Sequence, residues 1–157
     1  MSSWTGTVVS WAGLVGTAWQ GRLSRLPGEL GIGEGQAGPD DGLVLLDERC
    51  PGLTADDVRR VVASAVGAVA VGVRPVTDTV TTLEDGYVGP GVDRDGLVAV
   101  CSPVVVPASL RDRVPADDDL PGLVARLLDS GVPVVLVEVP VAARRLVDAA
   151  EVALLDQ

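Results

Sequence analysis

The chain has 157 residues, which is the size of one domain and enough to bury a core without metal or disulfide staples. Its formal net charge is −10, and it contains no His and no Lys, so every side-chain cation is an arginine. Binding of nucleic acid requires clustered cations, so such an acidic chain is a poor candidate for it. The same negative charge disfavours binding to anionic membranes. The composition also excludes an imidazole base or metal ligand and a lysine Schiff base.

The two cysteines, Cys50 and Cys101, have no second Cys or His close in sequence, so no zinc or iron–sulfur spacing is present. The N-terminus lacks the pattern of a secretory signal, and the most apolar run, residues 61–73, is too short to span a bilayer. We therefore expect reduced, partly buried thiols in a cytoplasmic protein with no membrane partner.

The front of the chain contains few clear patterns. A β-branched segment predicts a strand over residues 5–12, and the spacing of apolar residues predicts a short helix near 17–26. Six glycines and a proline over 28–42 predict a loop.

The middle of the chain predicts a strand, a helix and a second strand. Residues 43–47 are a continuous apolar run ending in an acid, which is typical of a parallel strand covered on both faces. Thr54 and Asp57 have capping-box spacing at the start of a helix whose apolar stripe is Val58, Val61, Val62 and Ala65 and which Gly67 ends. Residues 68–73 form the next apolar strand.

A Thr-rich, alternating segment over 75–83 predicts a strand that places Thr77 and Thr79 on one face and Asp78 on the other. Glu84-Asp85-Gly86 predicts a hairpin turn, followed by a return strand that Gly89-Pro90-Gly91 breaks. The segment has no continuous apolar face, so we expect an arm that projects from the sheet.

The remaining elements predicted from the sequence follow in alternation. They are a strand over 97–102, a short helix over 107–114, a helix through Leu128 preceded by three Asp at 117–119, a buried strand over 132–139 and a helix over 142–155. Strands alternating with helices predict an α/β fold, a three-layer sandwich.

Three places along the chain have residue types suited to phosphate chemistry. Asp47 follows a buried strand, where it either holds Mg²⁺ or caps a turn. Arg94 is either a bidentate phosphate ligand or a partner of Asp93 or Asp95. The segment 8–19 contains Ala12, Gly13 and Gly16, which suit either a phosphate-binding loop or an ordinary turn.

Five motifs are shared, in order and spacing, with one known family. They read LLDERCP at 45–51, PVTDTV at 75–80, VDRDGLVAVCSP at 92–103, ADDDL at 116–120 and ARRLVDAAEVALLD at 143–156. Through these motifs residues 42–157 resemble the 2-C-methyl-D-erythritol 4-phosphate cytidylyltransferases of the non-mevalonate isoprenoid pathway. PVTDTV and DRDGL are the most specific of the matches.

The resemblance implies a Rossmann-like, mostly parallel sheet of the nucleotide-diphospho-sugar transferase type with a projecting β-arm. It implies one nucleotidyltransferase-like domain over 1–157, with a reduced N-terminal part (1–41) and the β-arm at about 75–97. It also implies a homodimer in which the arms are exchanged.

The resemblance assigns roles to individual residues. Asp47 matches the metal-associated Asp of the family, and Arg145 falls near its sugar-phosphate lysine. Thr79 and Arg94 match the arm residues that reach the sugar phosphate bound by the neighbouring subunit. Ala12, Gly13 and Gly16 are what remains of the nucleotide loop.

Several functional residues of the family are replaced. Leu46 stands in place of its His, Cys50 in place of its Arg, Thr81 at a basic position and Val104 in place of its Gln. The Arg and Lys of its nucleotide loop have no counterpart here. Because nucleotidyl transfer depends on positioned positive charge, these losses predict a weak or absent reaction.

Three hypotheses follow. The first is a degenerate homologue whose catalysis is lost or strongly weakened and which has a binding or regulatory role, for example by pairing with an active paralogue through the arm. The second is an active enzyme that transfers CMP from CTP to methylerythritol phosphate with Mg²⁺, using Asp47, Arg94 and Arg145. The third is a non-catalytic phosphate-ester binder. CTP and a sugar phosphate are the candidate ligands across the three hypotheses. Convergence of those three residues on one cleft favours a ligand site, whereas burial of the cleft by Leu46 or a Trp favours decay.

Overall fold

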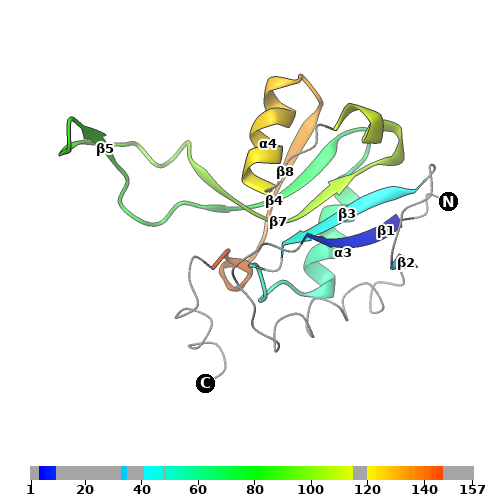
Figure 1. Cartoon of the computed structure of the whole chain (residues 1–157). Helices are drawn as coiled ribbons and strands as arrows, with labels where there is room; N and C mark the ends of the chain where they lie inside the picture. Colours follow the sequence, from blue (N-terminus) through cyan, green and yellow to red (C-terminus); the bar gives the residue numbers. More distant parts are fainter. Residues whose placement is uncertain (1–3, 10–32, 35–40, 48, 115–119, 147–157) are drawn as a thin grey trace.

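A computed structural model describes residues 4–9, 33–34, 41–47, 49–114 and 120–146 (Figure 1). The helix predicted near 17–26, the acidic run at 117–119 and most of the helix predicted over 142–155 lie outside the described residues.

A six-stranded mixed sheet with strand order β2-β1-β3-β7-β4-β8 forms the centre of the described fold. Three neighbouring pairs run parallel, and only β7 runs antiparallel to its neighbours. The strands are β1 (Trp4–Val9), β2 (Gly33–Glu34), β3 (Gly42–Asp47), β4 (Val69–Pro75), β7 (Val98–Val106) and β8 (Val134–Glu138). The short β2 lies where the sequence predicts only loop, and it is held by two residues of β1.

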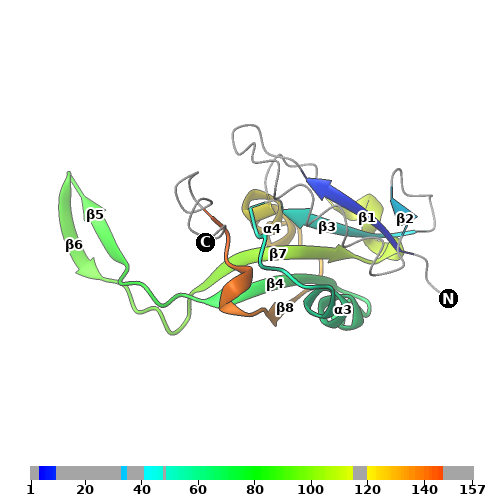
Figure 2. The ribbon, with the colours of Figure 1, turned by 90° about the horizontal axis from the view of Figure 1, so that it is seen from below.

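Helices cover both faces of the sheet, so the described residues form three layers (Figures 1 and 2). Helix α3 (Ala55–Ser64) packs on one face with an apolar cluster that includes Val44, Leu46 and Val58. Helix α4 (Leu120–Asp129) packs on the other face with a second cluster that includes Val71 and Leu127. The predicted three-layer α/β fold is confirmed.

The start of α3 is fixed by the predicted capping box. The Thr54 hydroxyl oxygen accepts from the Asp57 backbone N–H at 3.3 Å, and Asp57 Oδ2 accepts from the Thr54 backbone N–H at 3.1 Å. These bonds satisfy N–H groups that have no partner within the helix. The helix ends at Ser64 rather than at Gly67, which instead takes the positive φ of 69° in the turn to β4.

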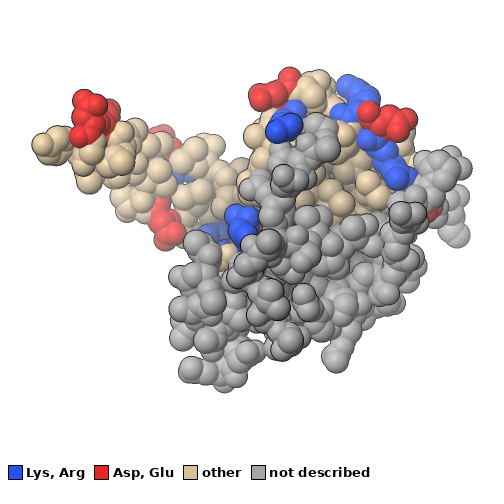
Figure 3. Space-filling model, in the orientation of Figure 1, with Lys and Arg blue, Asp and Glu red and all other residues tan. Residues whose placement is uncertain are grey.

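A two-stranded hairpin of β5 (Thr81–Glu84) and β6 (Tyr87–Gly91) extends away from the six-stranded sheet (Figures 1 and 2). Asp85 and Gly86 form its turn with φ of 50° and 85°, as the sequence predicts. Figure 3 shows acidic side chains near the far end of this hairpin, which stands clear of the rest of the molecule.

Two expectations about this part of the chain are wrong in detail. Residues 76–80 are not a strand, so Thr77 and Thr79 do not alternate along one. β6 continues through Gly91 because its residues still pair with β5.

The C-terminal part of the described chain departs from its sequence pattern. β8 is the edge strand beside β4, so it is only partly covered, and Leu136 is 49% exposed. The helix predicted from residue 142 is absent over 142–146, where a short 3₁₀ turn, η2 (Val141–Ala143), is followed by extended backbone at Arg144. The segment over 107–114 also forms a 3₁₀ helix, η1 (Ala108–Arg113), instead of an α-helix.

None of the described helices is long and apolar enough to cross a membrane.

Candidate functional site

Asp47 ends β3 and organises the turn that follows it. Its side chain is 1% exposed, and Oδ1 accepts a hydrogen bond from the Arg49 backbone N–H at 2.8 Å. Its own backbone N–H donates to Ser102 Oγ at 3.0 Å. The turn cap considered at Asp47 is therefore present in the structure.

Arg145 reaches the same carboxylate from the far end of the chain. Its Nε lies 3.1 Å from Asp47 Oδ2 across 98 residues of sequence, and its side chain is 27% exposed. The two residues are thus brought together as a partly buried ion pair.

Two backbone contacts hold the Arg145 segment in place. The Leu146 N–H donates to the Arg49 carbonyl oxygen at 2.7 Å. The turn η2 packs so closely on Gly52 that a Cβ there would collide with the Ala142 carbonyl oxygen. The glycine that follows Pro51 therefore allows the close approach that positions Arg145.

Sequence reasoning did not single out Ser102, which lies in β7 with no exposed surface and accepts the hydrogen bond from the Asp47 N–H. The signal that points to it is the polar Ser-Pro pair in the middle of an otherwise apolar strand. Its position ties β7 to the end of β3 at the point where the two strands separate.

Cys50 and Cys101 are both free and buried, as expected for reduced thiols. Burial raises the pKa of each thiol, and the Asp47 carboxylate raises that of Cys50 further. Both thiols therefore stay protonated at neutral pH, and neither is a nucleophile or an anionic metal ligand there.

A pocket of about 220 Å³ opens beside Arg145 and is lined by Arg74, Ala99, Val100, Cys101, Pro121 and Arg145. We call it the arginine pocket. Arg145 thus both lines this pocket and pairs with Asp47, which is not itself among the lining residues.

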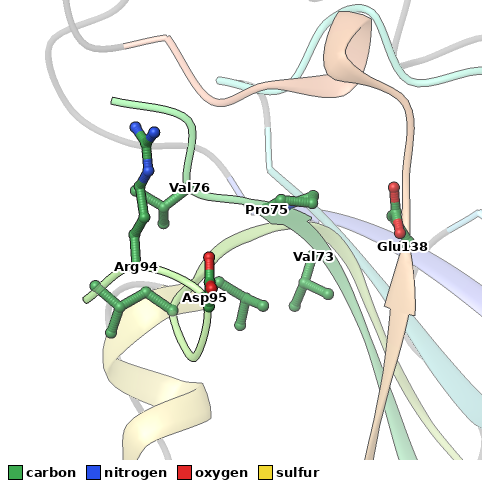
Figure 4. A pocket seen from close by; sticks show the side chains of 8 residues that line it. Val73, Pro75, Val76, Arg94, Asp95 and Glu138 are labelled. Atoms are coloured by element: carbon green, nitrogen blue, oxygen red, sulfur yellow. The ribbon is translucent and has the colours of Figure 1, made fainter. Parts of the chain in front are cut away.

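Arg94 lies elsewhere in the same chain. It donates to the Thr77 carbonyl oxygen and lines a second pocket of about 360 Å³ with Val73, Pro75, Val76, Asp95, Leu97, Val98 and Glu138. Figure 4 shows Arg94 and Glu138 on opposite sides of this pocket, with Pro75 and Val73 between them. Thr79 is exposed. Neither of these two pockets of the described residues is therefore lined by Asp47, Arg94 and Arg145 together.

Of the other positions singled out from the sequence, some are described by the structure and some are not. Leu46 is fully buried within the α3-side core, where the family pattern has its His. Ala12, Gly13 and Gly16 lie outside the described residues.

The described residues around Asp47 do not fit a Mg²⁺ site as they stand. Mg²⁺ takes oxygen ligands in octahedral geometry, and within the described residues no group of three Asp, Glu, Cys or His is placed to hold a metal ion. Both Asp47 oxygens already accept from N–H donors, one of them cationic. We derive no chemical step through a metal.

Several solved structures with a similar fold are synthases of one kind. The chain aligns with 2-C-methyl-D-erythritol 4-phosphate cytidylyltransferase from Thermus thermophilus at a TM-score of 0.70 and 20% identity, covering 98% of this chain and 97% of that one. The corresponding synthase from Anaerococcus prevotii gives a TM-score of 0.65 and 13% identity over 99% of both chains.

A further 4-diphosphocytidyl-2C-methyl-D-erythritol synthase gives a TM-score of 0.59 and 23% identity over 88% of this chain, which spans only 63% of that synthase. No protein-family model and no curated protein matches the sequence. The similarity carried by the sequence motifs is therefore confirmed at the level of fold: the chain has the fold of the 2-C-methyl-D-erythritol 4-phosphate cytidylyltransferases, with a sequence that has diverged far from theirs.

Proposed function

We propose that this protein is a divergent cytoplasmic relative of the 2-C-methyl-D-erythritol 4-phosphate cytidylyltransferases that binds a sugar phosphate and has lost, or greatly weakened, cytidylyl transfer. The observation that carries the proposal is that Arg145, which pairs with Asp47, also lines the arginine pocket. The ion pair lies at the C-terminal end of β3, where ligands bind in open α/β sheets.

The weak reaction follows from lost charge. The positions that match the family's His and Arg are Leu46 and Cys50, and both side chains are fully buried in the α3-side core. Removing one donor that stabilises developing charge costs about 100-fold or more in rate. Two such losses therefore predict a rate at least about 100-fold below that of an intact enzyme, and about 10⁴-fold below it where the two effects are independent.

The proposal is tested by binding and turnover on the same preparation. Isothermal titration should show binding of methylerythritol phosphate that Arg145→Ala weakens, and no micromolar affinity for CTP with Mg²⁺. A pyrophosphate-release assay with CTP, Mg²⁺ and methylerythritol phosphate should give almost no signal, with the Thermus thermophilus enzyme as the positive control. Micromolar CTP binding would contradict the loss of nucleotide handling, and steady pyrophosphate release would establish an active transferase.

We also propose that the hairpin of β5 and β6 joins two copies of this chain. Its apolar residues Leu83, Tyr87 and Val88 are each three-quarters or more exposed. An isolated two-stranded hairpin is only marginally stable in water, so a covering partner would stabilise it. In such a dimer Thr79 and Arg94 would face the partner's site, as the resemblance implies.

Sedimentation should therefore show a dimer at tens of micromolar. Replacing Leu83, Tyr87 and Val88 together by Ser should shift the protein to monomer because the uncovered apolar area is removed. Leu128→Ser, which changes an apolar residue on α4 that is 60% exposed, is the matched control and should leave the dimer intact. A monomeric wild-type protein would count against the hairpin contact and against Arg94 acting across it.

A further inference from the structure

Arg74 is a cation of the arginine pocket that neither the motifs nor the resemblance single out. It lies next to last in β4 and pairs with Ala99 of β7, so the two side chains project from the same face of the sheet. Cys101 follows Ala99 by two residues along β7 and shares that face. This register places the Arg74 side chain on the same face as Ala99 and Cys101, and all three residues line the pocket together with Arg145.

The Arg74 guanidinium has no ion-pair or hydrogen-bond partner within the part of the chain that the structure describes. The positive charge of Arg74 lowers the pKa of the Cys101 thiol, against the stronger effect of burial. A partly buried arginine that faces a pocket without a carboxylate leaves its N–H donors available to a ligand.

Among the described strands, the sheet is open where the pocket lies. β3 pairs with β7 only over Leu43–Leu45, opposite Val104–Val106, and then turns away after Asp47. The other half of β7, from Val98 to Val100, pairs with β4 alone among the described strands. A ligand can therefore reach Arg74 and Arg145 past the edge of β7 without displacing a paired strand.

The electrostatic surroundings favour an anion. Arg145 uses Nε for Asp47, and its two terminal nitrogens carry further N–H donors. Arg74 adds a second positive charge, so Arg74, Arg145 and Asp47 together carry a net positive charge, within a chain of net charge −10. Pro121 lines the pocket from the first turn of α4, whose N-terminal end carries the positive end of the helix dipole.

We propose that Arg74 and Arg145 jointly bind the phosphate of a small phosphate monoester, and that Arg74 is the residue that selects a dianion over a monoanion. This inference rests on the proposed function because it concerns the same pocket. It adds Arg74 to the residues that bind the ligand. Arg145 alone is largely neutralised by Asp47, whereas the added charge of Arg74 matches a second negative charge on the ligand.

The size of the pocket limits the ligand. At about 220 Å³ it is smaller than the roughly 300–1,000 Å³ of pockets that enclose drug-sized molecules. A phosphate on a short polyol is of suitable size, and a whole nucleoside triphosphate is not. The arginine pocket is therefore a phosphate-ester pocket rather than a nucleotide pocket.

The test measures binding of three probes by isothermal titration: methylerythritol phosphate, glycerol 3-phosphate and glycerate, the last a monoanion of similar size. Arg74→Gln should weaken both phosphate esters by about tenfold or more, since a charge-assisted hydrogen bond is lost, and should change glycerate binding much less. Arg74→Lys keeps the charge without the planar fork and should give an intermediate affinity. Arg144→Gln removes the same charge from the exposed neighbour of Arg145 and should have no effect.

The outcomes separate this inference from the proposed function. If Arg74→Gln binds both esters as well as wild type while Arg145→Ala does not, the Arg74 inference is wrong and the proposed function stands. If glycerol 3-phosphate binds with Arg74 dependence and methylerythritol phosphate does not bind, Arg74 keeps its role and the proposed ligand is wrong. If neither ester binds to folded wild-type protein, both proposals fail. Circular dichroism of each variant establishes that it is folded, and Arg74→Lys serves if Arg74→Gln does not fold.

Discussion

Replacing Asp47 by Ala is expected to lower the free energy of unfolding by about 3 kcal/mol, because breaking a buried ion pair strands the remaining charge. Asp47 is 1% exposed, and its loss leaves Arg145 without its only recorded ion-pair partner among the described residues. It also leaves the Arg49 N–H without its 2.8 Å acceptor. This loss of stability lies at the low end of the range usual for breaking a buried ion pair, because the Arg145 side chain is partly exposed to solvent. Chemical denaturation measures the change directly, and the melting temperature should fall by about 6–12 °C.

Two further variants assign the effect to its causes. Asp47→Asn keeps an oxygen acceptor for the Arg49 N–H but removes the charge, so we expect it to lose about half as much stability. A double-mutant cycle with Arg145→Gln should show coupling of at least about 1 kcal/mol. Asp93→Ala is the matched control, because Asp93 makes the same kind of side-chain bond, to the Asp95 N–H, at an exposed turn. An Asp47→Ala variant as stable as the Asp93→Ala variant would mean that the ion pair contributes nothing in solution.

Local signals in the sequence predicted the local structure well. The capping box at Thr54 and Asp57 and the turn at Asp85-Gly86 depend on residues a few positions apart, and both form as expected. The apolar run before Asp47 likewise forms β3, with β1 parallel beside it. The cap, the turn and the strand β3 itself are each determined by residues close together in the sequence, so they can be predicted from the sequence alone.

Features that depend on distant neighbours could not be predicted in this way. β3 and β4 are joined by α3, yet β7 lies between them and runs antiparallel to both. β8 reads as a buried strand because its residues are apolar, but the pattern does not indicate that it lies at the edge of the sheet. The extended backbone at Arg144 likewise comes from packing of η2 on Gly52, which the helical periodicity of the segment does not show.

The candidate site was only partly accessible to sequence reasoning. Motif resemblance assigned Asp47 and Arg145 to the same candidate site, but it did not predict their ion pair, since no spacing rule joins residues that far apart. Arg74 looks like a charge flanking an apolar run, and Ser102 looks like an interruption in a strand. The position of Arg74 in the site follows from the register of β4 with β7, and that of Ser102 from its hydrogen bond to the Asp47 N–H at the end of β3.

Restoring the arginine of the family's first motif, by Cys50→Arg, is expected to destabilise the protein by more than about 3 kcal/mol without restoring cytidylyl transfer. Cys50 has no exposed surface and packs within the apolar cluster beneath α3. A guanidinium there is larger than the thiol and loses its hydration, and the nearest carboxylate, Asp47, already pairs with Arg145. The new charge would therefore be buried without a partner of its own.

Urea denaturation and the pyrophosphate-release assay test this prediction together. Val66→Arg introduces the same charge at a side chain that is 84% exposed, and it should leave stability unchanged within about 0.5 kcal/mol. Cys50→Ala removes the thiol without adding charge and separates the loss of packing from the burial of charge. If Cys50→Arg instead keeps wild-type stability and releases pyrophosphate, position 50 opens onto a working cleft. In that case the residue at position 50 alone would account for the weak transfer that we propose, and the α3-side core would not exclude a nucleotide.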